Sequence, residues 1–99
     1  MIAFYRSASI APGKIRESMM FAQEIAAYIK ERTGTEVTVA VPVGGNPNRV
    51  GWAAQYDNLA GLEAMMGTLM ADEKYLELVA NGSTNFIAGS VHDDIWSTV

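Results

Sequence analysis

His92 is the only imidazole in the chain and so the side chain best suited to act as a general acid or base near neutral pH. Neighbouring residues of a strand point to opposite faces, so Asp94 rather than Asp93 is the expected same-face partner of His92. His92 is therefore a candidate catalytic acid or base at the rim of a ligand cavity. A solvated residue at a strand end is the alternative. We expect no metal site, because no further ligand cluster supports a His-Asp-Asp set.

Arg6 is the second candidate catalytic residue. It belongs to a strand that we expect to be central, and a guanidinium there could hold an anionic oxygen of a ligand. A buried Arg6 would need a carboxylate partner, from Glu36 or from the ligand, whereas an exposed Arg6 would need none.

Three aromatic residues are candidate ligand-binding residues: Trp52, Tyr56 and Tyr5. Trp52 and Tyr56 share one face of a strand, about 13 Å apart, and could stack against an aromatic or polyketide-like molecule. They could equally be core or interface aromatics that need no ligand. The methionines at helical spacing favour core packing over an adaptable pocket wall; they are Met19, Met20, Met65, Met66 and Met70.

Composition restricts the class of protein. A chain of 99 residues predicts a single domain over 1–99. Its composition, 49% hydrophobic and 18% charged residues, is apolar for so small a protein. Seven Lys and Arg against eleven Asp and Glu oppose nucleic-acid binding. The chain has no cysteine for thiolate chemistry or disulfides. With neither a signal peptide nor a membrane-length apolar run, it is expected to be a cytoplasmic protein without a membrane partner.

The hydrophobic periods predict strand, helix, strand, strand, helix, strand. Period-two alternation predicts strands over 2–9, 35–43, 49–57 and 85–91, and period 3.6 predicts helices over 14–32 and 59–70 with a short further helix after Asp72. Gly34 is expected to end the first helix, while Asn58 (or Asp57) and Asp72 are expected to cap the later ones. Pro42 places the second strand at an edge. This order predicts an α+β, ferredoxin-like βαββαβ fold, a four-stranded antiparallel sheet with helices on one face.

Neither face of the predicted sheet is strongly charged. Gly51 and Ala53 on one side would let a helix approach closely, which leaves Trp52 and Tyr56 for the other. Two helices cover one face only, and covering the second is worth on the order of 10 kcal/mol before association entropy is included. We therefore expect a homodimer with the open faces packed together.

The chain resembles the dimeric α/β barrel superfamily, which includes antibiotic-biosynthesis monooxygenase-like and NIPSNAP-like domains. The resemblance covers nearly the whole chain. It rests on Pro12-Gly13-Lys14, Gly44-Gly45-Asn46-Pro47, Arg49-Val50-Gly51-Trp52 and Asp72-Glu73-Lys74-Tyr75. It implies two sheets that meet around a lumen, which in some members holds a small organic substrate. The catalytic Asn-Trp-His set of the haem-degrading branch has no match here.

The expected function is therefore binding of a small apolar or aromatic molecule in the lumen, or its transformation as a cofactor-free monooxygenase or isomerase. His92 would be the acid or base, Arg6 would hold an anionic oxygen, and Trp52, Tyr56 and Tyr5 would shape the pocket. The alternative is a non-catalytic homodimer, either structural or a ligand-sensing (ACT-like) module.

Overall fold

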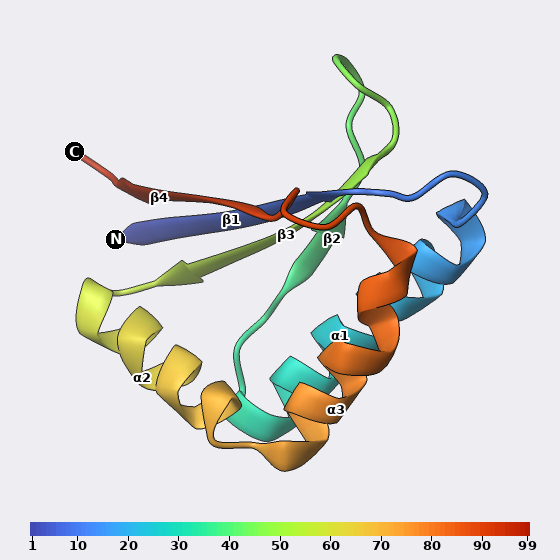
Figure 1. The fold of residues 1–99 in the computed structure, drawn as a ribbon. Helices are drawn as coiled ribbons and strands as arrows, with labels where there is room; N and C mark the ends of the chain where they lie inside the picture. The colour runs from blue at the N-terminus through green and yellow to red at the C-terminus, as the bar shows by residue number, and fades with distance from the viewer.

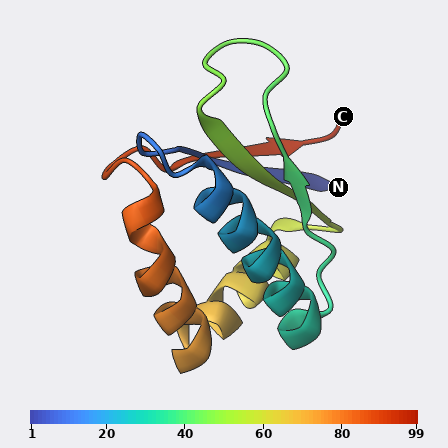
Figure 2. The same ribbon diagram turned by 90° about the vertical axis from the view of Figure 1, so that its right-hand side faces the viewer.

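Four antiparallel strands form one sheet in the order β2-β3-β1-β4, and three helices pack on one of its faces (Figures 1 and 2). The computed structural model describes all residues, 1–99. Its elements are β1 (Ile2–Ser9), α1 (Ile15–Thr33), β2 (Thr38–Ala40), β3 (Arg49–Tyr56), α2 (Leu59–Met70), α3 (Glu73–Gly82), a 3-10 turn (Ser83–Asn85) and β4 (His92–Ser97). The predicted α+β architecture is confirmed. No helix is long and apolar enough to cross a bilayer.

The helix boundaries follow the predicted caps. Gly34 has a φ of 78°, and its N–H donates to the Lys30 carbonyl at the end of α1. The Asn58 side chain accepts from the Gly61 N–H, and the Asp72 side chain accepts from the Tyr75 N–H. The two side-chain contacts satisfy N–H groups at helix N-termini, and the Gly34 N–H satisfies a carbonyl at the C-terminus of α1, groups that the helices otherwise leave without partners.

The last strand lies later in the chain than the sequence pattern predicts. The segment 85–91 is not a strand: Phe86 forms an isolated bridge with Ile10, and the Ser90 N–H donates to the Ile87 carbonyl in a turn where Gly89 has a φ of 77°. The strand is instead His92–Ser97, which begins just after the predicted range. Because β4 pairs with β1, the register places Asp93 opposite Arg6 and Asp94 opposite Tyr5.

The sheet register also corrects the expected faces. Arg6 is opposite Trp52 in the β1–β3 pair, so both point toward the helices, together with Phe4, Ala54 and Tyr56. The Trp52 Nε1–H donates to the Ala22 carbonyl of α1 at 3.2 Å, which fixes the ring on the helix side. The small residues Gly51 and Ala53 lie on the uncovered face instead. The prediction that Trp52 and Tyr56 face away from the helices is therefore wrong.

The core lies between the helices and the centre of the sheet. Ile25 and Ile29 of α1 pack with Leu69 of α2 and Tyr75 of α3. A second cluster joins Ala22 of α1 to Ile10 and Val50 at the other end of the sheet. The opposite face of the sheet is covered by no element of the chain, as Figure 1 shows.

Candidate functional site

Two apolar cavities lie between the sheet and the helices, and they share Arg6, Trp52 and Tyr75. Their volumes are about 190 Å³ and 280 Å³. We call the pair the helix-side groove and its two parts the α2 lobe and the α3 lobe. The three shared residues lie at the junction of the lobes, so one ligand could contact all of them.

The groove is almost entirely apolar. The α2 lobe is lined by side chains from the sheet and from α2, among them Phe4, Tyr56, Met65, Met66, Leu69 and Met70. The α3 lobe is lined by side chains from α1, α3 and the segment before β4, among them Phe21, Ile25, Val79, Phe86, Ile87 and Val91. Arg6 is the only charged residue that lines either lobe. Polar recognition of a ligand would therefore centre on the junction.

Arg6 is held in a two-point ion pair with Asp93 of the edge strand. Its Nε donates to Asp93 Oδ1 at 2.7 Å and its Nη2 to Oδ2 at 2.9 Å. These contacts raise the pKa of Arg6 and lower that of Asp93. The two side chains are each about one-third exposed, 33% and 32%. The carboxylate expected from Glu36 is thus supplied by Asp93, while Glu36 pairs with Lys30.

Tyr75 brings a second polar group to the junction. It is a core residue of α3, and burial raises the pKa of its hydroxyl, while the neighbouring Arg6 guanidinium offsets part of that rise. Asp72 positions the helix that carries Tyr75. Besides capping α3, the Asp72 carboxylate accepts from the Tyr28 hydroxyl at 2.7 Å and from Arg32 Nε at 3.0 Å. The start of α3 is thereby bound to α1.

Tyr56 lines the far end of the α2 lobe. Its hydroxyl oxygen is buried and no group lies in hydrogen-bonding geometry with it, although Thr35 is near. Burial raises the pKa of this hydroxyl, and Thr35 offsets part of the rise. A buried hydroxyl without a partner is uncommon in folded proteins, and here it could donate to a ligand oxygen.

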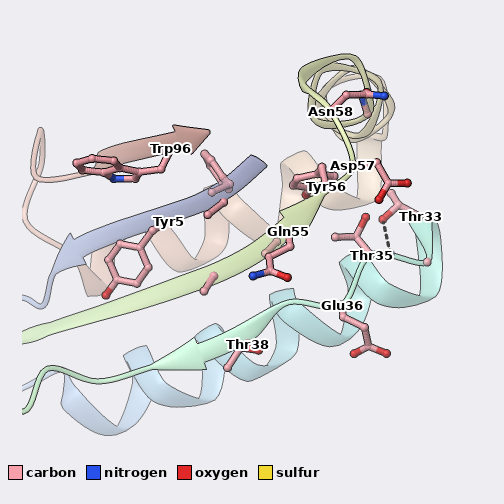
Figure 3. Close-up of a pocket in the computed structure, with 16 residues that line it drawn as sticks. Tyr5, Thr33, Thr35, Glu36, Thr38, Gln55, Tyr56, Asp57, Asn58 and Trp96 are labelled. Carbon is pink, nitrogen blue, oxygen red and sulfur yellow. Dashed lines mark hydrogen bonds between the residues drawn. The ribbon is translucent and has the colours of Figure 1, made fainter. Parts of the chain in front are cut away.

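A larger hollow of about 860 Å³, lined by both polar and apolar residues, reaches over the uncovered face of the sheet. Figure 3 shows Tyr5 and Trp96 on this side, with Gln55 and Thr38 on the neighbouring strands. The Tyr5 ring covers Gly51, where an added Cβ would lie 2.1 Å from the Tyr5 hydroxyl. Tyr5 and Trp96 therefore belong to the uncovered face, apart from the helix-side groove.

His92 also lies on the uncovered face. It is opposite Ser7 in the β1–β4 pair, and its Nε2 lies 3.4 Å from Asp94 Oδ1, so the expected same-face neighbour is correct. The His92 side chain is 70% exposed. The structure thus brings Arg6, Trp52 and Tyr56 together in the groove and places His92 and Tyr5 on the other side of the sheet. The roles predicted for these five residues stay predictions. No group of three metal-ligating side chains comes together anywhere in the chain.

The sequence does not single out Tyr75, which lines the groove, or Asp93, which pairs with Arg6 beside it. Tyr75 appears there only in the motif Asp72-Glu73-Lys74-Tyr75, and Asp93 only as a neighbour of His92. The alternation of the final strand could have placed Asp93 with Ile95 on one face, but only once the strand was known to begin at His92.

Solved structures share this fold, although no family model and no curated protein matches the sequence. An uncharacterised NIPSNAP domain protein from Burkholderia xenovorans superimposes with a TM-score of 0.84 at 17% identity, over 100% of this chain and 95% of the other. A NIPSNAP family protein from Agrobacterium tumefaciens gives a TM-score of 0.82 at 20% identity, over 99% and 85%. An antibiotic biosynthesis monooxygenase superimposes with a TM-score of 0.75 at 14% identity, over 100% of this chain and 99% of the other. The predicted resemblance to these proteins is confirmed for the fold.

Proposed function

We propose that this protein binds a small, mostly apolar organic molecule in the helix-side groove. The observation that carries the proposal is the single charged residue, Arg6, at the junction of two apolar lobes. Together the lobes fall within the ~300–1,000 Å³ range of small-molecule sites, which are mostly apolar with a few placed polar groups. Arg6 and Tyr75 would contact the polar atom of the ligand, while Trp52 and Tyr56 would contact its apolar frame.

The proposed ligand site lies between the sheet and the helices of one chain, whereas the resemblance seen in the sequence implies a lumen between two sheets. Three of the five residues selected from the sequence line the space between sheet and helices, and three of the methionines expected to be core, Met65, Met66 and Met70, form its α2 wall. Flexible, polarisable methionine side chains adapt to apolar ligands of varied shape.

A ligand screen by thermal shift tests the proposal, with flat aromatic and polyketide-like compounds. Met66→Phe should fill part of the α2 lobe and remove the stabilisation by compounds that stabilise the wild type. The matched control is Met20→Phe, because Met20 is 68% exposed on α1 and lines neither lobe. Equal loss of stabilisation in both variants, or no loss in Met66→Phe, would refute the site.

Turnover of the bound molecule without a metal or bound cofactor is part of the same proposal. The N–H groups of Arg6 that Asp93 leaves free would donate to a ligand oxygen on which negative charge develops, as isomerisation or direct oxygenation of a phenol or enol by O₂ requires. Compounds that bind should be converted under air by the wild type and not by Arg6→Gln, with products followed by mass spectrometry. Binding without conversion would favour the alternative, a ligand-sensing protein.

The second part of the proposal is a homodimer through the uncovered face of the sheet. Trp96 is 69% exposed there and pairs with Ala3 of β1, while the Tyr5 ring covers Gly51 on the same face. A large exposed aromatic on a sheet face that no helix covers is a surface that a second copy could cover. Light scattering coupled to size exclusion should give twice the 10.7 kDa chain mass at micromolar concentration, and Trp96→Arg should give the single mass. A measured mass of 10.7 kDa for the wild type, that of one chain, would refute the dimer.

A further inference from the structure

We infer that Asp93 determines ligand specificity in the helix-side groove, selecting uncharged molecules with a carbonyl-type oxygen and rejecting carboxylates. The inference rests on the proposed function, since it concerns the ligand of the same groove. Its basis is the ion pair at the junction of the two lobes.

Asp93 neutralises the only charge that the groove presents. Both carboxylate oxygens of Asp93 are bonded to Arg6, through Nε at 2.7 Å and Nη2 at 2.9 Å. No other lysine or arginine lines either lobe. A carboxylate ligand would therefore enter an apolar space in which its charge has no free counter-charge. It would also lie close to the Asp93 carboxylate, with which it would share one guanidinium.

The ion pair leaves hydrogen-bond donors free for an uncharged oxygen. A guanidinium has five N–H groups, of which Asp93 accepts from one on Nε and one on Nη2. The Tyr75 hydroxyl lies close enough to Arg6 to interact with a third, so at least two N–H groups remain for a ligand. A ketone, aldehyde or quinone oxygen accepts such bonds without bringing a net charge. The Tyr75 hydroxyl can itself donate to the same ligand oxygen at the junction.

The uncovered face supplies a matched control for this test. Asp94 follows Asp93 in β4 but points to the other side of the sheet, where it lies 3.4 Å from His92. Asp93→Asn and Asp94→Asn thus make the same chemical change one residue apart. Only the first removes charge from the ion pair with Arg6.

The experiment compares two probes with the same ring frame, 2-acetylnaphthalene and 2-naphthoate, by isothermal titration calorimetry at pH 7. The wild type should bind the uncharged ketone about tenfold or more tightly than the carboxylate, which corresponds to about 1.4 kcal/mol. Asp93→Asn should reverse or abolish this preference, because the Arg6 charge is then free. Asp94→Asn should keep the wild-type preference.

The outcomes separate the inference from the proposed function. Equal or tighter binding of 2-naphthoate by the wild type overturns the inference and leaves the groove as a ligand site. An unchanged preference in Asp93→Asn overturns it also. Binding of neither probe by any of the three proteins overturns both. If Asp93→Asn does not fold, as checked by circular dichroism, equal or tighter binding of 2-naphthoate by the wild type still overturns the inference.

Discussion

The ring of Phe21 in α1 lies directly against Gly82 at the end of α3. A Cβ added at Gly82 would lie 2.3 Å from Cδ1 and 2.4 Å from Cε1 of that ring. The Phe21 ring is itself packed edge-on against Trp52 and Phe86, at centroid distances of 6.4 Å and 5.7 Å. It therefore has little freedom to move away. This contact sets how closely α1 and α3 approach above the α3 lobe.

Gly82→Ala should lower the free energy of unfolding by about 1–3 kcal/mol, the usual cost of overpacking a filled site. The matched control is Gly67→Ala in α2, where an added Cβ has no neighbour within 4 Å. That substitution should raise the free energy of unfolding by about 0.5–1 kcal/mol, because alanine restricts the unfolded chain. Urea unfolding followed by circular dichroism measures both. A stabilised Gly82→Ala would show that Phe21 is not confined.

Asp72 should make stability depend on pH in the acid range. The hydrogen bond from the Tyr28 hydroxyl, with those from the Tyr75 N–H and Arg32, lowers the pKa of Asp72 in the folded protein. A lowered folded pKa adds stability that is complete above the unfolded value of about 3.9 and is lost as pH falls through the folded pKa. The wild type should therefore exceed Asp72→Asn in urea midpoint at pH 7, and the difference should shrink at pH 3. Asp57→Asn, on an exposed residue, should show no comparable difference at pH 7.

The two tryptophans should respond differently to replacement by phenylalanine. Trp52→Phe removes the hydrogen bond to the Ala22 carbonyl and part of the ring that contacts Phe21 and Phe86, so it should cost about 1–2 kcal/mol of unfolding free energy. Trp96 is 69% exposed in the single chain, so Trp96→Phe should change the stability of the monomer by less than about 0.5 kcal/mol. Chemical unfolding at one fixed protein concentration compares them. A larger loss of unfolding free energy in Trp96→Phe than in Trp52→Phe would mean that the uncovered face contributes more to stability than the core contact of Trp52.

Ligand binding in the groove should not depend on His92. Its side chain and that of Arg6 leave opposite faces of the sheet. The dissociation constant of 2-acetylnaphthalene should therefore stay within twofold in His92→Ala and rise about tenfold or more in Arg6→Gln. Calorimetric titration of the two variants measures this. Clearly weaker binding by His92→Ala would show that the imidazole contributes to the ligand site.

The sequence predicts the fold where local chemistry decides it. The caps at Asn58 and Asp72, the glycine at the end of α1 and the edge position of the strand near Pro42 each depend on a residue and its immediate neighbours. Such features need no knowledge of distant contacts. The central position of β1 and the uncovered face follow from the order of the elements.

The candidate site could be predicted only in part, because it depends on register between distant strands. A shift of one residue exchanges the faces, so Trp52 could be assigned to either side until its pairing with Arg6 was known. The final strand shows the same difficulty, since 85–91 and 92–97 both alternate. The turn at Gly89 and the pairing of Asp93 with Arg6 select the later segment. These long-range contacts have no counterpart in local sequence.

The side chains of β1 point alternately to the two faces of the sheet, so neighbouring residues contact different surroundings. The helix layer is contacted by the even-numbered residues Phe4, Arg6 and Ala8. The uncovered face of the sheet carries the odd-numbered residues Ala3, Tyr5 and Ser7. A systematic substitution scan of this strand should thus yield two interleaved sets of phenotypes, ligand defects at even positions and assembly defects at odd ones. Substitutions at even positions could then alter the proposed ligand groove without changing the uncovered face, and substitutions at odd positions could do the reverse.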